Sequence, residues 1–135
     1  MENRTINLNI ETPLLAEWEE MNFKRVTISG FKPLSLLPNI TEVSGLIVRV
    51  KTAFEYDDGS IFLHDIDITL YVKESHLNYT IRVRTRERMG GPDWDLLYYA
   101  AELHNVANED LPHWADSFEE MEQLEMENNR FPNNF

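Results

Sequence analysis

Apolar and polar residues alternate along three consecutive stretches in the middle of the chain, at about residues 46–56, 60–73 and 79–88. A period of two is typical of strands with one buried face, because successive side chains of a strand point to opposite sides. The short polar connections "DDG" and "ESHLN" favour hairpins between these strands. The pattern predicts a three-stranded antiparallel meander over about residues 44–88, with the stretch 60–73 as its central strand.

The same alternation predicts which side chains share a face of this meander. A three-residue "DDG" loop would pair Val50 with Ile66 and would place Lys51 opposite Asp65 and Arg49 opposite Asp67. The apolar face is expected to hold Leu46, Val48, Val50, Thr52, Phe54, Tyr56, His64, Ile66, Ile68, Leu70, Val72, Tyr79, Ile81 and Val83. The outer face is expected to hold Arg82, Arg84, Arg86 and Arg88 beside the aspartates, so the charges on this side would neutralise one another.

Other segments show helical spacing. Thr12 and Pro13 suit the start of a short helix over about 13–21. Apolar residues spaced by three and four predict a second helix over about 92–106. Ser117 and Glu120 fit a capping box at the start of a last, acidic helix. Strand patterns also occur around "TINLNI" and "FKRVTISGF", before the meander.

These elements predict an α+β fold. We expect a mainly antiparallel sheet of four or five strands with the central meander at about 44–88. A short N-terminal helix and two C-terminal helices would pack on its apolar face. A length of 135 residues suits one domain with a real core. We expect a single globular domain over 1–130 and a loose tail over 131–135, where "FPNNF" ends the chain.

Charge changes this picture because it is unevenly spread. The chain carries 24 acidic and 12 basic residues, a formal net charge of −12. Residues 1–90 hold 13 acidic and 11 basic residues, a sum of −2, whereas residues 91–135 hold 11 acidic and 1 basic, a sum of −10. A negative surface repels nucleic acid and anionic membranes and favours basic partners. We therefore expect no direct binding to nucleic acid or membrane.

The sequence lacks the residue patterns that several kinds of metal-binding and catalytic site require. The chain has no cysteine and no histidine pair at a recognised metal spacing, so we expect no metal site and no cofactor. Asp65 and Asp67 could be a catalytic pair, but flanking cations would keep both ionised, whereas a general acid needs a raised pKa. His64 is interpreted as a core histidine. No nucleotide-binding loop or nucleophile elbow is present, so the chain is not expected to be an enzyme.

The arginine stripe at positions 82, 84, 86 and 88 leaves two interpretations open. Four guanidinium groups along one strand face could grip phosphates, with tyrosines nearby for stacking. The aspartates opposite them favour a solvated face whose charges are paired within the molecule, and we prefer this interpretation.

The segment "WADSFEEMEQLEMENN" suggests a function. Its carboxylates, spaced along a helix that rises about 1.5 Å per residue, could approach the charge density of duplex DNA, about one charge per 1.7 Å. We expect a small acidic inhibitor that blocks a basic nucleic-acid-handling protein, by nucleic-acid mimicry, as in phage anti-defence or toxin-immunity proteins. The target would be a nuclease, a restriction or CRISPR effector, a toxin or a polymerase. The candidate partner-binding residues are Trp114, Asp116, Phe118, Glu119, Glu120, Glu122, Glu125 and Glu127.

Two alternatives stay open. The first is a homo-oligomeric structural or assembly subunit without catalytic activity, joined through a sheet edge or the aromatic helix. The second is an enzyme whose site is assembled from distant residues. The chain has no apolar stretch long enough for a membrane span and no apolar secretory segment at its start, so we expect a cytoplasmic protein.

Overall fold

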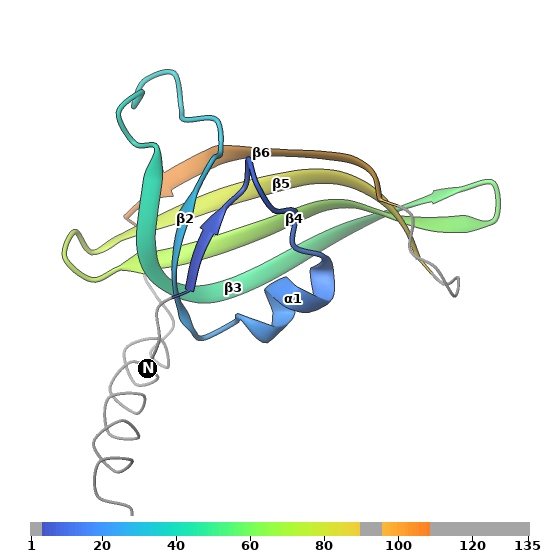
Figure 1. Ribbon diagram of the computed structural model, residues 1–135, viewed down its shortest axis with the longest axis horizontal. Helices are drawn as coiled ribbons and strands as arrows, with labels where there is room; N and C mark the ends of the chain where they lie inside the picture. Colours follow the sequence, from blue (N-terminus) through green and yellow to red (C-terminus); the bar gives the residue numbers. More distant parts are fainter. Residues whose placement is uncertain (1–3, 90–95, 109–135) are drawn as a thin grey trace, which may run out of the picture.

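The computed structural model describes residues 4–89 and 96–108, and these residues form one six-stranded sheet in the order β1-β2-β3-β4-β5-β6 (Figure 1). The elements are β1 (Arg4–Asn7), α1 (Leu15–Glu20), β2 (Arg25–Ser29), β3 (Glu42–Asp57), β4 (Ser60–Val72), β5 (Leu77–Met89) and β6 (Leu96–Ala107). β1 and β2 are parallel and are connected through α1, whereas every later pair of neighbours is antiparallel. The predicted meander is present as β3, β4 and β5, with β4 between the other two.

The predicted α+β fold is wrong. The sheet has six strands rather than four or five, it is mixed, and α1, with six residues, is the only helix among the described residues. The predicted helix over 92–106 is the strand β6 where the structure describes it, from Leu96 onward. The last predicted helix and the tail 131–135 lie outside the described residues. No helix in the described part of the chain has the length and apolar character needed to cross a membrane.

β6 forms a strand because it satisfies the backbone groups that β5 would otherwise leave unpaired at its edge. Ten residue pairs of β5 and β6 lie opposite each other, from Asn78 with Ala107 to Glu87 with Leu96. In this conformation Tyr99, Ala101 and Leu103 pack against the core at alternate positions. The spacing that resembled an amphipathic helix is therefore overridden by pairing with β5.

The sheet curls around its core, so that the segment after β2 reaches the edge strand β6. The segment after β2 bonds to β6, because Lys32 N–H donates to the Ala101 carbonyl at 2.9 Å and Leu103 N–H donates to the Lys32 carbonyl at 2.7 Å. α1 packs its buried Trp18 and Leu15 into the core. Figure 1 shows α1 beside the curled part of the sheet, while the hairpin of β3 and β4 reaches beyond it at one end.

The β3–β4 hairpin has a shorter turn than the sequence suggested. Asp57 pairs with Ser60, so the loop is only Asp58 and Gly59, whose φ angles of 49° and 77° fit a type I′ turn. Relative to the predicted register, each residue at the tip gains a new partner, and Phe54 lies opposite Leu63 rather than Phe62.

Two bulges then move the register again. One shift lies between Ala53 and Phe54, where His64 is the extra residue of β4, and the other lies between Ile47 and Arg49 of β3. Between these bulges Lys51 lies opposite Asp67. The predicted Lys51–Asp65 and Arg49–Asp67 pairs are therefore wrong by two residues, because the sequence pattern shows neither the shorter turn nor the bulges.

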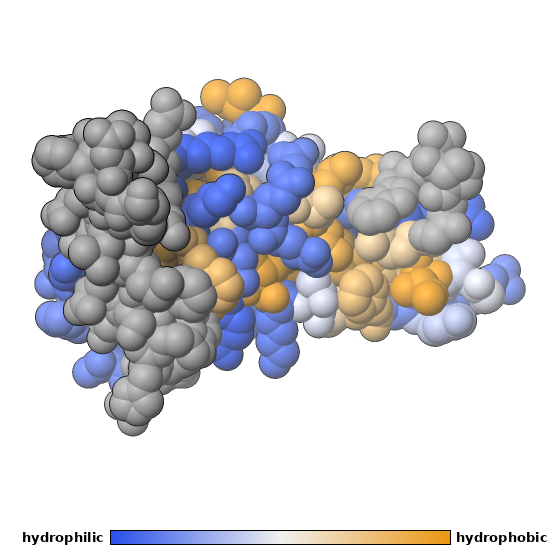
Figure 2. All heavy atoms as spheres, turned by 90° about the horizontal axis from the view of Figure 1, so that it is seen from below, coloured by the Kyte–Doolittle hydropathy of each residue, from blue (hydrophilic) through white to orange (hydrophobic). Residues whose placement is uncertain are grey.

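We call residues 49–65 of this hairpin the arm. Leu63 is fully buried against the core, but the residues of β3 on the same face lose that cover: Phe54, opposite Leu63, is 53% exposed, and Tyr56, nearer the tip, is 76% exposed. Figure 2 shows hydrophobic atoms gathered toward this end of the molecule. The arm therefore presents apolar surface that the described core does not cover.

Candidate functional site

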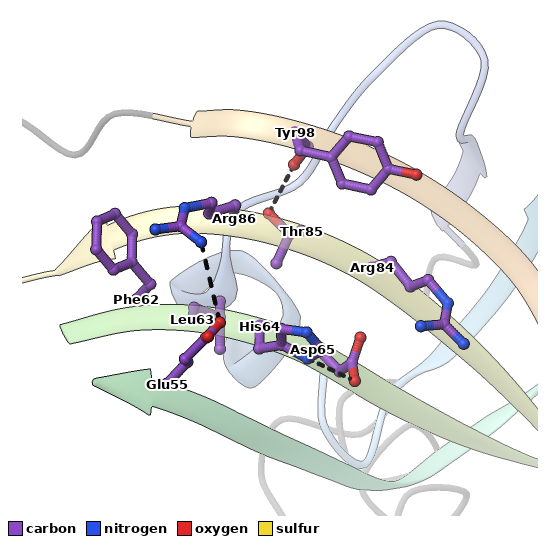
Figure 3. Close-up of a pocket in the computed structure, with 9 residues that line it drawn as sticks. All are labelled: Glu55, Phe62, Leu63, His64, Asp65, Arg84, Thr85, Arg86 and Tyr98. Carbon is purple, nitrogen blue, oxygen red and sulfur yellow. Dashed lines mark hydrogen bonds and ion pairs between the residues drawn. The ribbon is translucent and has the colours of Figure 1, made fainter. Parts of the chain in front are cut away.

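A hollow with a cavity volume of about 380 Å³ lies on the outer face of the arm, where four strands contribute side chains (Figure 3). β3 gives Glu55, β4 gives Phe62 to Asp65, β5 gives Arg84 to Arg86, and β6 gives Tyr98. The lining therefore combines two aromatic rings with carboxylates, guanidinium groups and an imidazole, all on one side of a sheet.

The bulge in β4 places His64 and Asp65 along one wall of the hollow. Because His64 is the extra residue, it does not alternate into the core as predicted, and its side chain is 52% exposed. Its Nδ1 lies 3.0 Å from Asp65 Oδ2 (Figure 3). The other carboxylate oxygen, Oδ1 of Asp65, is buried without a hydrogen-bond partner in the described part of the chain. The interpretation of His64 as a core histidine is therefore wrong.

Arg86 forms the opposite wall. Its guanidinium carbon lies 4.1 Å from the centre of the Phe62 ring, a cation–π contact. Its Nη2 donates to Asp57 Oδ2 at 2.9 Å, and its Nη1 lies 4.0 Å from Glu55 Oε2. Arg86 thus reaches across β4 to two carboxylates of β3, which fixes the aromatic ring and the guanidinium in one arrangement.

The other arginines of the stripe also have partners within the chain. Arg84 Nε donates to Glu102 at 3.0 Å, and Arg88 Nη2 donates to the Ser60 hydroxyl at 3.3 Å. Arg82 donates two hydrogen bonds to Asp67, and this bonding, opposed by desolvation, lowers the pKa of that carboxyl. These pairs support the interpretation of a face whose charges are neutralised within the molecule.

Most polar groups of the hollow already have a partner within the chain. Thr85 lies in the hollow, but its hydroxyl already donates to the Tyr98 carbonyl at 2.9 Å. The described residues contain no group of three histidines or acidic residues placed to hold a metal ion. An aromatic wall beside the unpaired Oδ1 of Asp65 suits a ligand that is flat or cationic, such as an arginine or lysine side chain.

The predicted partner-binding residues Trp114, Asp116, Phe118, Glu119, Glu120, Glu122, Glu125 and Glu127 all lie outside the described residues. Sequence reasoning missed the hollow, because it depends on the bulge at His64 and on β6 being a strand. The sequence did indicate three of the lining residues: Arg84, Arg86 and Asp65 were expected together on the outer face, and the structure places them there.

Comparison with protein-family models, with curated proteins and with solved structures gives no match in any of the three.

Proposed function

We propose that this protein is a small acidic inhibitor that binds a basic nucleic-acid-handling protein and blocks its nucleic-acid groove. The proposal rests on one contrast within the chain. The described sheet engages its own arginines, as in the Arg82–Asp67, Arg84–Glu102 and Arg86–Asp57 pairs. Residues 109–135 carry eight acidic residues and one basic residue, a sum of −7. Because carboxylates of the described sheet already pair with the arginine stripe, we propose that this acidic segment serves a partner.

The mechanism is competition with nucleic acid. Glu119, Glu120, Glu122, Glu125 and Glu127 supply closely spaced negative charges that a cationic groove attracts over long range. Trp114 and Phe118 supply anchors that bury on contact, since aromatic residues dominate interface energetics. The hollow at His64 and Asp65 would take a basic side chain of the partner. The targets named above act in the cytoplasm, which is where this protein would meet them.

The first experiment identifies the partner by capture from the native host, followed by mass spectrometry. Binding is then measured across salt with three proteins. One is the natural chain, and one carries Glu→Gln at 119, 120, 122, 125 and 127. A control carries Glu→Gln at five exposed positions of the described part: 17, 19, 20, 42 and 74. Both variants change net charge equally, so a local role predicts that only the first loses affinity and salt dependence. Equal losses, or no loss, would reject the proposal.

A homo-oligomeric structural or assembly subunit is the second candidate function. The observation that favours it is the exposed apolar surface near the tip of the arm, at Phe54 and Tyr56. In this case the protein would be an oligomer whose mass does not change with concentration, and replacing the five glutamates at 119–127 would leave that mass unaffected. Capture distinguishes the two candidates whatever the oligomeric state: an inhibitor retains a basic partner that is lost when the five glutamates at 119–127 are replaced, whereas a structural subunit retains none.

A further inference from the structure

Among the described residues, one edge of the sheet has no backbone partner along the arm. β2 pairs with β3 only at Glu42–Leu46, and Phe23 and Lys24 extend the cover to Ile47. From Arg49 to Asp57, β3 bonds to β4 on one side and to no backbone group on the other among the described residues. A nine-residue strand edge of this kind is a template for pairing with another strand.

The charges along this edge have an order that a second copy would match. On the outer face β3 presents, from Arg49 to Asp57, the alternate residues Arg49, Lys51, Ala53, Glu55 and Asp57. All five are exposed, and the sign runs from positive through neutral to negative. Antiparallel pairing of two such strands brings opposite ends together, so each cation meets an anion.

We propose that two copies of this chain dimerise by antiparallel pairing of their β3 edges, with Ala53 opposite Ala53 at the two-fold axis. This register places Arg49 opposite the partner's Asp57 and Lys51 opposite the partner's Glu55. The axis repeats both pairs, so the contact contains four. A contact between identical surfaces closes at two copies and does not extend into a filament.

The other face of the strand fits the same register. There Tyr56 would lie opposite Val50 of the second copy, and Phe54 opposite Thr52. Tyr56 and Phe54 are 76% and 53% exposed in the single chain, while Val50 and Thr52 are partly buried. Cross-strand pairs of an aromatic with a β-branched residue stabilise antiparallel sheets. Pairing would therefore cover the apolar surface that the core leaves exposed.

The ends of the free edge also select this register. The turn of one copy, Asp58 and Gly59, would stop where Phe23 and Lys24 already cover β3 of the other. A shift by two residues toward the body is blocked at that cover. A shift by two the other way leaves Arg49 opposite the turn, Ala53 opposite Glu55 and Lys51 opposite Asp57, so only two of the four ion pairs can form.

The carboxylates of this edge keep their contacts within the chain. Arg86 bonds to Asp57 and approaches Glu55 from the β4 side. A carboxylate accepts several hydrogen bonds, so a cation from the second copy can bind on the open side. Arg49 and Lys51 form no ion pair with any other described residue. The pairing therefore adds partners without breaking existing ones. It does not rest on the proposed inhibitory function.

Cross-linking tests the axis directly, because the chain has no cysteine of its own. Directly opposite residues of an antiparallel pair have Cα atoms about 4.5–5.5 Å apart. That separation suits a disulfide. Ala53→Cys is expected to give a covalent dimer under mild oxidation. Glu55→Cys, on the same face but opposite Lys51, is the matched control and is expected to stay largely uncross-linked. Equal cross-linking of the two variants would overturn the proposed register.

Charge exchange tests the pairs. In one variant Arg49→Glu and Lys51→Glu make the edge negative, and in the other Glu55→Lys and Asp57→Lys make it positive. Each variant alone is expected to be a monomer by light scattering, with a dimer dissociation constant raised about 100-fold by the repulsive cross-strand pairs. An equimolar mixture restores all four pairs and is expected to give a species of twice 15.9 kDa.

Thermal unfolding of each variant checks that the fold survives. A natural chain that is monomeric at every concentration would overturn the proposal. A dimer that persists in both charge variants, or a mixture that stays monomeric, would overturn it as well.

Discussion

Arg82 on β5 and Asp67 on β4 lie directly opposite each other, and the guanidinium donates two hydrogen bonds to the carboxylate. The Nε–Oδ1 distance is 2.8 Å and the Nη2–Oδ2 distance is 3.0 Å. The side chains retain 24% and 22% of their exposure, so water screens the pair only in part. Such two-point contacts combine strength with a fixed orientation, and this one ties β4 to β5 in the middle of the sheet.

Removing the charge of Asp67 is expected to destabilise the fold. Asp67→Asn should lower the free energy of unfolding by about 1–2 kcal/mol, because the amide keeps one acceptor oxygen for Arg82 but loses the second hydrogen bond and the charge. Glu102→Gln is the matched control: its pair with Arg84 is more exposed, and its loss should cost under about 0.5 kcal/mol. Urea unfolding measures both values. If the two variants lose equal unfolding free energy, the two-point geometry of the Arg82–Asp67 pair adds no stability beyond that of an exposed ion pair.

The same pair predicts a loss of stability in acid. The bonds from Arg82 lower the pKa of Asp67 below its ordinary value of 3.8, so the unfolded state binds a proton more readily than the folded state. The contribution is fully present above 3.8 and is lost as the pH falls through the folded pKa. Unfolding free energies measured from pH 6 to pH 2 should fall more steeply for the natural chain than for Asp67→Asn.

Glu87 predicts the opposite dependence on pH. It is 1% exposed, lies opposite Leu63 and Leu96, and has one carboxylate oxygen without a hydrogen bond among the described residues. Burial raises its pKa above the ordinary 4.5, so the folded state holds the proton more tightly. Its contribution is present below about 4.5 and is lost as the pH rises through the folded pKa.

Glu87→Gln should therefore stabilise the protein at pH 7, by about 1 kcal/mol, since an amide replaces a buried charge. It should also flatten the decline in stability above pH 4.5. Glu74→Gln, at an exposed turn position, should change neither value. Thermal unfolding at several pH values is the measurement, and an unchanged pH profile for Glu87→Gln would contradict the argument.

Two glycines with positive φ should differ in their tolerance of alanine. At Gly30 (φ +82°) an added Cβ would lie 2.6 Å from Asn7 Oδ1 and 2.7 Å from the Leu8 backbone nitrogen. At Gly59 (φ +77°) it would meet nothing within 4 Å. Gly59→Ala should cost about 1–2 kcal/mol from the backbone conformation alone, and Gly30→Ala should cost distinctly more. Chemical denaturation of the two variants compares them.

The bulge at His64 should matter more than its side chain. His64→Ala removes a half-exposed ring and should change stability by less than about 0.5 kcal/mol. Deleting His64 removes the extra residue, so either Leu63 turns outward or the tip must pair anew. The deletion should therefore cost more than 2 kcal/mol, about the value of burying one leucine. Comparable stability of the two variants would show that the bulge does not set the faces of the arm.

Local periodicity was a sound guide wherever two neighbouring strands had complementary patterns. From Asp65 onward the faces of β4, and those of β5 opposite it, are as the alternation indicated: Ile66 opposes Val83, and Asp67 opposes Arg82. A period of two over a dozen residues leaves little freedom there, because a slip by one residue would expose every apolar side chain. The turn and the bulges escaped prediction, since one extra residue shifts the pairing without changing the alternation on either side of it.

The candidate site was likewise predictable only in part from the sequence. Sequence alone placed Arg84, Arg86 and Asp65 on one face, and it located the excess negative charge in the last third of the chain. It could not show that Tyr98 joins them, because Tyr98 belonged to an expected helix. Helical spacing in the segment 96–107 was genuine, but helix propensity is a weak preference, and tertiary context overrides it.

The sequence by itself therefore determined the meander, the apolar and charged faces of β5 and of β4 from Asp65 onward, and the distribution of charge, because each follows from side chains a few residues apart. Only the tertiary structure decided that β6 is a strand, that His64 faces the solvent and that the edge of β3 stays open beyond β2. Each of these depends on which backbone groups far apart in the chain find partners. That pairing is settled when the sheet closes around its core.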